Sequence, residues 1–357
     1  MKLGLGLYKH MLTPDNYDFA RQCGATHLVI HLVDYFNQGK GNPADNQPTG
    51  SDAGWGVAGR PDALWTLDDL LRIKAEINAA GLELEAVENI DPAHWYDILL
   101  DGLQKDRHIE NVKTLIRTVG RAGIPVLGYN FSIAGVCGRI TGPFARGRAV
   151  SVGMNAPDDS PIPNGMVWNM IVDPDAPPGV LPEISHDQLW SRYAAFLDRV
   201  LPVAEEAGVT LALHPDDPPL PAMRRQPRLV YQPRMYDRVV GINPSPRNQF
   251  EFCLGTLAEM TDGDVYDAVD RCSRQRRIAY VHVRNITGKV PHYRETFIDD
   301  GDLDMRRILH ILRQNNFDGV LIPDHTPQMT CQAPWHAGMA HALGYLKGIL
   351  SDKPPPP

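Results

Sequence analysis

Eight short apolar segments recur along the chain, and each has the composition of a buried strand. They are LGLGLY from Leu3, HLVIHL from His27, LELEAVE from Leu82, PVLGYNF from Pro125, TLALHP from Thr210, FEFCLG from Phe250, IAYVHVRN from Ile278 and GVLIPDH from Gly319. Short and nearly continuous apolar runs are typical of parallel strands that are covered on both faces.

Between these segments, apolar residues recur at the three-to-four-residue spacing of amphipathic helices. The predicted helices are Asp15–Cys23, Thr66–Ala80, Asp106–Ala122, Ser185–Ala207, Leu303–Gln314 and Trp335–Leu350. Alternation of strands and helices predicts an α/β fold, a (β/α)₈ TIM barrel. An open doubly wound sheet is the alternative, but no GxGxxG motif follows a predicted strand in the required setting.

Two segments, Val33–Leu64 and Ser132–Ile184, are too long for plain connections and are rich in turn-forming or charged residues. In a barrel, such insertions usually belong to the βα loops on the catalytic face. No internal repeat or linker composition divides the chain. We therefore expect one catalytic domain over residues 1–352 and a disordered proline-rich tail over residues 353–357.

Composition narrows the class of protein. The chain has 35 Lys and Arg against 43 Asp and Glu, a formal net charge of −8, which does not favour nucleic acid or an anionic membrane as a partner. Its apolar runs are too short for a membrane span or a signal peptide. The five cysteines are odd in number and form no CxxC motif, so we expect a reducing compartment, the cytoplasm.

Candidate chemistry lies at the ends of four consecutive predicted strands, which carry His214, Cys253, His282 and Asp324 in turn. Reactive groups of a barrel lie at these carboxyl ends. Imidazole, thiolate and carboxylate together suit a divalent transition metal such as Zn, Fe or Mn. Taken singly, Cys253 is more typical of a buried core cysteine, and Asp324 of a helix N-cap.

Polar residues also end the second, third and fourth strands, namely His31, Glu88, Tyr129 and Asn130. They could bind the hydroxyls of a polar substrate or make hydrogen bonds at the barrel rim. The charged segment from Lys289 to Asp302 is either a solvated loop or an active-site lid. The arginines at 224, 225, 228 and 234 could hold an anion, although such a run is more often a solvated surface.

At these residues the sequence resembles the mannonate dehydratase family. The matching segments are LPVAEEAGVTLALHPDDPP (Leu201–Pro219), QPRLV (Gln226–Val230), FCLGTL (Phe252–Leu257), VHVRNI (Val281–Ile286), DDGDLDM (Asp299–Met305) and PDH (Pro323–His325). The similarity follows the same order over most of the chain, and HPDDPP is its most specific part.

The resemblance implies a cytosolic, xylose-isomerase-like TIM barrel that uses Mn²⁺ or Fe²⁺, held by His214, Cys253, His282 and Asp324. It implies a hydro-lyase that converts D-mannonate to 2-keto-3-deoxygluconate and water in hexuronate catabolism. The acid and base candidates are His325, Tyr129 and Asp217. Substrate-binding candidates are Arg284, which could bind a carboxylate bidentately, with Asn285, His31, Glu88 and Asn130. A homo-oligomer, dimer or larger, is compatible with a barrel.

Several positions depart from the family pattern. The family has a segment with Asp-Trp and an arginine after YNF, and this chain has YNFSIAGVCGR without Asp-Trp. The third strand of the family usually ends in a serine-containing form, and this chain has ENIDP. Ile322 and Thr326 flank PDH, and LYKHML replaces an aromatic-Gly-Pro segment. These changes face the substrate while the metal ligands persist. These changes motivate the dehydration of another sugar acid, or a metal-dependent sugar isomerase or epimerase. A binding protein with a structural zinc closed by four ligands is a separate alternative.

Overall fold

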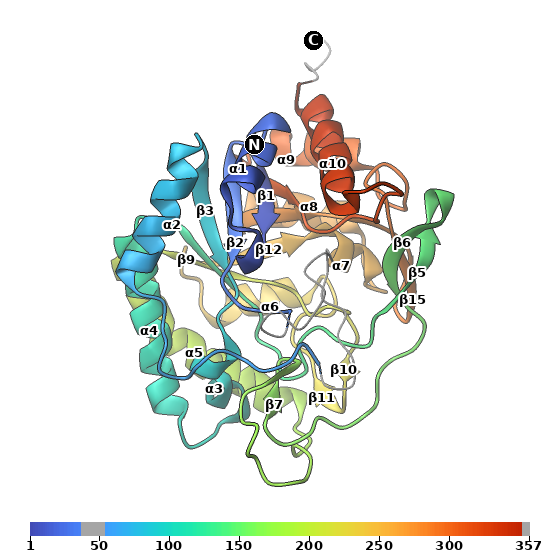
Figure 1. Cartoon of the computed structure of the whole chain (residues 1–357). Helices are drawn as coiled ribbons and strands as arrows, with labels where there is room; N and C mark the ends of the chain where they lie inside the picture. Colours follow the sequence, from blue (N-terminus) through green and yellow to red (C-terminus); the bar gives the residue numbers. More distant parts are fainter. Residues whose placement is uncertain (37–53, 352–357) are drawn as a thin grey trace.

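Eight parallel strands close into a barrel in the computed structural model, which describes residues 1–36 and 54–351 (Figure 1). The strands are β1 (Lys2–Leu7), β2 (His27–His31), β3 (Glu83–Glu88), β4 (Val126–Tyr129), β9 (Thr210–Leu213), β12 (Asn248–Cys253), β13 (Ile278–Val283) and β16 (Val320–Pro323). Around the barrel the order is β1-β16-β13-β12-β9-β4-β3-β2. All eight predicted strands and the TIM-barrel class are confirmed.

Helices pack around the outside of the barrel, because most of them lie in the connections between one parallel strand and the next; α10 follows the last strand. The long ones are α1 (Pro14–Gln22), α2 (Leu67–Ala79), α4 (Lys105–Arg121), α5 (His186–Ala207), α9 (Met305–Gln314) and α10 (Pro334–Ser351). These are the six predicted helices. The chain adds α3 (Tyr96–Leu100), α6 (Met235–Ile242), α7 (Leu254–Glu259) and α8 (Val265–Arg274), which the sequence analysis missed.

Local sequence explains where two of these helices begin. Thr66 caps α2 and forms a capping box with Asp69, as its sequence predicts. Asp264 accepts hydrogen bonds from the backbone N–H groups of Tyr266 and Asp267 and thereby starts α8. The apolar faces of these helices pack on strands whose outward side chains are also apolar, so the main core lies between the barrel and its helices.

The long insertion after β4 folds into antiparallel structure. Strands β5 (Ile140–Ala145) and β6 (Ala149–Met154) join β14 (Asn285–Lys289) and β15 (His292–Thr296) in one sheet of order β14-β15-β6-β5 (Figure 1). The segment after the seventh barrel strand, expected to be a solvated loop or a lid, is therefore a paired hairpin. Two-stranded ribbons β7 (Met166–Val167) with β8 (Met170–Ile171), and β10 (Ala222–Met223) with β11 (Gln226–Pro227), complete the described insertions.

The expectation of a solvated arginine run is wrong for two of its members. Arg228 is completely buried and Arg224 is nearly so, whereas Arg225 and Arg234 are exposed. Arg228 donates to Ser132 Oγ at 2.7 Å and to Asp216 Oδ1 at 3.1 Å, so its charge is compensated inside the protein. Asp216 belongs to the HPDDPP segment, and the arginine holds that segment in place.

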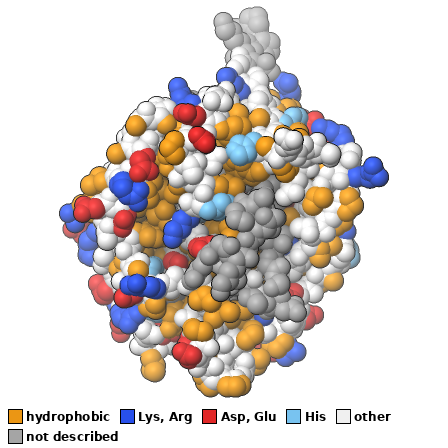
Figure 2. Space-filling view, viewed as in Figure 1, with side chains coloured by type: hydrophobic (Ala, Val, Ile, Leu, Met, Phe, Trp, Pro, Cys, Tyr) orange, Lys and Arg blue, Asp and Glu red, His pale blue; other side chains and the backbone are white. Residues whose placement is uncertain are grey.

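On the face of the molecule in Figure 2, acidic and basic side chains are interspersed over the part of the surface that is not drawn in grey. Within the described residues, no helix combines the length and apolarity needed to cross a membrane. The proline-rich tail, and part of the predicted insertion Val33–Leu64, lie outside the described residues.

Candidate metal centre and cavity

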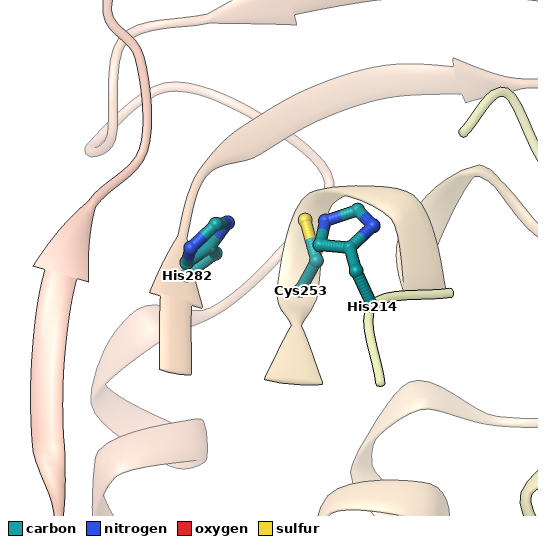
Figure 3. A group of neighbouring side chains, drawn as sticks. All are labelled: His214, Cys253 and His282. Carbon is teal, nitrogen blue, oxygen red and sulfur yellow. The ribbon is translucent and has the colours of Figure 1, made fainter. Parts of the chain in front are cut away.

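Three side chains point toward one another from neighbouring strand ends (Figure 3). His282 is in β13, Cys253 ends β12, and His214 follows directly after β9. The pairing of β12 with β13 places Cys253 beside His282 in register, and β12 also pairs with β9. One donor atom from each of the three residues lies within 4.8 Å of the other two.

Each imidazole of this group has one nitrogen engaged by the protein and one left for an ion. His214 Nδ1 lies 2.6 Å from the carbonyl oxygen of Pro215, and its Nε2 faces the cavity side of the barrel. His282 Nε2 lies 3.1 Å from Glu88 Oε2, while His282 Nδ1 is buried without a hydrogen bond and lies 3.5 Å from Asp324 Oδ1. Metal-binding histidines typically have this arrangement, in which the second ring nitrogen donates to an oxygen.

Cys253 is prepared as a thiolate. Its Sγ accepts hydrogen bonds from the hydroxyl of Thr256 at 3.2 Å, the backbone N–H of Thr256 at 3.5 Å and Arg284 Nη2 at 3.6 Å. Burial raises the pKa of this thiol, but the charge of Arg284 and the neighbouring His214 and His282 outweigh burial and lower the pKa to about 5. The thiolate is the form that binds metals. The buried donors therefore fit a divalent transition metal.

A cavity lies above these donors. Its polar side contains the histidines 31, 214, 282 and 325 with Glu88, Asp217, Glu251 and Asp324. Arg139, from the insertion after β4, is the cavity's basic residue among those described. Carboxylates, imidazoles and one guanidinium together can bind a small anionic molecule and transfer its protons.

The opposite side of the cavity is an aromatic wall formed by Tyr8, Tyr35, Trp55 and Trp168. The ring of Trp55 lies edge-on to both Tyr35 and Trp168, with centroids 5.3 and 5.5 Å apart. Such rings exclude water from a reacting centre and pack on the C–H faces of a polyhydroxylated chain.

The structure brings most of the predicted site residues to this cavity. His31, Glu88, Asn130, Asp217, His214, His282, Asp324 and His325 all line it. Cys253 lies directly behind the two histidines. Three predicted residues, Tyr129, Asn285 and Arg284, lie elsewhere and have other partners.

Tyr129 faces the helices. Its hydroxyl makes a 2.9 Å hydrogen bond with the hydroxyl of Tyr193 on α5. Side chains alternate along a strand, and the preceding Gly128 faces the barrel interior, where a Cβ would lie 2.7 Å from Glu251 Oε2. Tyr129 must therefore point outward, away from the cavity.

Asn285 and Arg284 support the site from behind. Asn285 Nδ2 donates to the carbonyl oxygens of Ile298 and Leu303, both at 3.1 Å, and so holds the chain that follows β15. Arg284, 2% exposed, donates to Glu295 Oε1 at 2.8 Å, Asp217 Oδ2 at 3.1 Å and Glu259 Oε1 at 3.2 Å. A guanidinium with these partners has little capacity left for a substrate carboxylate.

The sequence analysis missed Glu251, Arg139 and the aromatic wall. Glu251 lies two residues before Cys253 on β12 and so shares its face of the strand, which is the signal that could have found it. Arg139 and Trp168 come from an insertion with no barrel periodicity, so only the fold reveals their place. Tyr8 directly follows β1, at a strand end like the predicted ligands.

The chain is similar in sequence to proteins of known family. A sequence model of the family described as D-mannonate dehydratase (UxuA) matches residues 47–138 and 180–352. The chain belongs to the mannonate dehydratase family. It is 32% identical over 306 residues to the mannonate dehydratase of Streptococcus equi subsp. zooepidemicus, covering 80% of this chain and 82% of the relative. The mannonate dehydratase of Streptococcus pneumoniae is 31% identical over similar shares, 80% and 82%.

Solved structures agree on the architecture. The crystal structure of mannonate dehydratase from Streptococcus suis serotype 2 superimposes with a TM-score of 0.76 and 26% identity, covering 98% of this chain and 92% of that one. An L-ribulose 3-epimerase structure has a TM-score of 0.56 and 14% identity, with 98% and 94% coverage, and shares the fold alone. Residues 139–179, which include Arg139 and Trp168, lie outside the family match.

Proposed function

We propose that this protein is a metal-dependent sugar-acid dehydratase that converts D-mannonate to 2-keto-3-deoxy-D-gluconate and water. The observation that carries the proposal is the convergence of His214, Cys253, His282 and Asp324 on one side of a cavity, in a chain of the mannonate dehydratase family. A reducing compartment suits a thiolate ligand, so we place the enzyme in the cytoplasm.

The four residues would hold the metal ion, and we propose Mn²⁺ or Fe²⁺. A mixed set of imidazole, thiolate and carboxylate accepts either ion. When bound, the ion supplies electrostatic stabilisation to the negative charge that develops next to the substrate carboxylate.

Arg139 is our candidate for binding the substrate carboxylate, in place of Arg284. It lines the cavity beside the acidic groups, and the nearby charge of Asp217 is the main influence that raises its pKa against the effect of burial. Its guanidinium is therefore charged at neutral pH and can bind a carboxylate bidentately. This contact would fix which carbon of the substrate faces the acidic and imidazole groups.

His325 is our candidate for proton transfer. It lines the cavity, its Nε2 lies 3.2 Å from Asp324 Oδ2, and its Nδ1 lies 3.0 Å from Glu295 Oε2. A neutral His325 can take the proton from C2, and the resulting imidazolium is stabilised by both carboxylates. The imidazolium can then give this proton to the C3 hydroxyl, which leaves as water. The C2–C3 enol that remains becomes the 2-keto-3-deoxy acid when its hydroxyl proton moves to C3. Asp217 suits proton transfer less well, because Arg284 and Arg139 lower its pKa despite burial.

A second candidate is the same chemistry, or an isomerisation, on another sugar substrate. The insertion outside the family match contributes both Arg139 and Trp168 to the cavity. Part of the wall that the substrate meets therefore comes from a segment that the family model does not match, which is the observation that favours a changed substrate.

The test uses purified Mn²⁺-loaded enzyme with a panel of aldonates, including D-mannonate, and neutral aldoses and ketoses. We expect a 2-keto-3-deoxy acid from D-mannonate, absent in H214A. A 2-keto-3-deoxy acid from another aldonate alone would correct the substrate. Interconversion of neutral sugars without loss of water would replace the dehydratase by the second candidate.

A further inference from the structure

Glu251 lies on the floor of the cavity, one layer below the thiolate. It belongs to β12, faces the barrel interior and is completely buried. Gly128 on β4 provides the space, because a Cβ at that position would lie 2.7 Å from Glu251 Oε2 and 2.6 Å from the hydroxyl of Tyr280. Only β9 separates β4 from β12 in the barrel, and the missing side chain at Gly128 leaves room for the carboxylate of Glu251.

Glu251 and Glu88 share one positive partner, because His282 Nε2 lies 3.2 Å from Glu251 Oε1 and 3.1 Å from Glu88 Oε2. Neither oxygen of Glu251 accepts a hydrogen bond within the described part of the chain. Glu88 is a second buried carboxylate on the same floor, but it is better satisfied, since His282 Nε2 lies 3.1 Å and the Tyr280 hydroxyl 3.3 Å from its Oε2. Two buried carboxylates that share a single imidazole keep an excess of negative charge, which is costly to bury.

The spacing of the donors fits a cation. Oε1 of Glu251 lies 3.2 Å from His282 Nε2 and 4.0 Å from His214 Nε2. With metal–ligand bonds of about 2.0–2.2 Å, adjacent ligands at right angles lie roughly 3 Å apart and opposite ligands roughly 4.2 Å apart. One donor atom each from Glu88, Glu251 and His282 lies within 4.8 Å of the other two.

We propose a second, overlapping cation position formed by Glu88, Glu251 and His282, which takes a divalent ion that prefers oxygen ligands. Two ligand sets then share His282: one contains the thiolate, and the other contains two carboxylates. A neutral imidazole offers a lone pair on only one nitrogen, so an ion at Nδ1 beside Cys253 excludes an ion at Nε2 beside Glu251. While Cys253 is a thiolate, an ion is held by the set that contains it; when the thiolate is removed, a hard ion such as Mn²⁺ binds to the carboxylate set.

The test measures ion binding without reference to catalysis. Metal-free wild type, C253A, E251Q, C253A/E251Q and C253A/E83Q are titrated with Mn²⁺, with free Mn²⁺ followed by its electron paramagnetic resonance signal. Glu83 is an exposed carboxylate of the same charge on β3 and supplies the matched control. We expect one Mn²⁺ per chain in wild type, C253A and C253A/E83Q, and loss of binding in C253A/E251Q.

Co²⁺ separates the two positions by spectroscopy. Wild type and E251Q should show a sulfur-to-cobalt charge-transfer band, and C253A should bind Co²⁺ without that band. Circular dichroism checks that each variant is folded. Two results would overturn the second position: C253A that binds no Mn²⁺, or C253A/E251Q that binds it as C253A does. If C253A/E251Q binds Mn²⁺ as C253A does, the charge of Glu251 is neutralised by a proton and not by a metal ion. Either outcome stands whether or not D-mannonate proves to be the substrate.

Discussion

His325 Nδ1 lies 3.0 Å from Glu295 Oε2, and this contact joins the end of the eighth barrel strand to the added antiparallel sheet. Oε1 of the same glutamate accepts a hydrogen bond from Arg284 at 2.8 Å. One carboxylate thus orients the imidazole that we assign to proton transfer and the guanidinium that contacts Cys253.

Replacing His325 should abolish most of the catalysis while sparing the metal. We expect H325Q to lower kcat by roughly 10²–10⁴-fold, the range for loss of a general acid or base. Steady-state kinetics and metal analysis of the same preparation check this. H336Q, on the exposed surface where His336 contacts Asn16, is the control. A metal-replete H325Q enzyme with wild-type kcat would remove His325 from proton transfer.

Exchanging Arg139 for lysine should weaken substrate binding. Lysine keeps the charge but loses the bidentate geometry, so we expect KM to rise by about 10–100-fold, with a smaller change in kcat. Initial rates over a range of substrate concentrations measure the two parameters separately. R146K changes an arginine on the same insertion that pairs with Asp299 outside the cavity, and it should leave KM unchanged. An unchanged KM in R139K would return the carboxylate-binding role to another residue.

Acid should destabilise the metal-free protein partly through Glu295. Burial raises the pKa of this carboxyl, but His325 and Arg284 outweigh burial and hold it at about 2, below its ordinary value of 4.5. Between these pH values the unfolded chain binds the proton and the folded chain does not, so the free energy of unfolding falls as pH drops from 4.5 towards 2.

The E295Q variant tests this dependence. It should be less stable than wild type at neutral pH, and it should lose less stability than wild type on acidification, by about 3 kcal/mol at most. Urea unfolding at several pH values measures both. Parallel pH profiles for E295Q and wild type would show that Glu295 titrates alike in the folded and unfolded states.

Replacing Arg228 should lower the free energy of unfolding. The R228M variant leaves Asp216 buried without its cation, a change that costs about 3–5 kcal/mol. Chemical denaturation measures the loss, and R234M, at an exposed arginine, should change stability by less than about 0.5 kcal/mol. Equal stability of the two variants would show that the HPDDPP segment does not depend on this ion pair.

The barrel could be predicted from sequence because its strands are apolar on both faces and contrast with amphipathic helices. The ligands could be predicted because the carboxyl ends of parallel strands converge, so position in a strand translates into position in space. Tyr129 shows where that reasoning fails. A residue at a strand end faces either the cavity or the helices, because side chains alternate between the two faces of a strand. The neighbouring Gly128 has no side chain, so the sequence of this strand did not show which face points to the cavity.

Other parts depended on contacts that sequence patterns do not encode. Glu251 sits in an apolar strand, and only closure of the barrel shows that it faces Glu88. The short helix α8 repeats its apolar residues over barely three turns, too few for a secure period. Strands β5 and β6 each contain a glycine, and β5 also contains a proline. They form because β6 pairs with the edge of β15 and β5 pairs with β6.

That edge has a consequence for how such proteins diverge. The hairpin after the fourth barrel strand and the hairpin after the seventh are hydrogen-bonded to each other through β6 and β15. Shortening either one alone would leave unpaired backbone groups along the other. The two loops must therefore change in concert, and a chimaera that exchanges substrate preference between relatives would need to carry residues 139–179 and 285–302 together as a single inherited module.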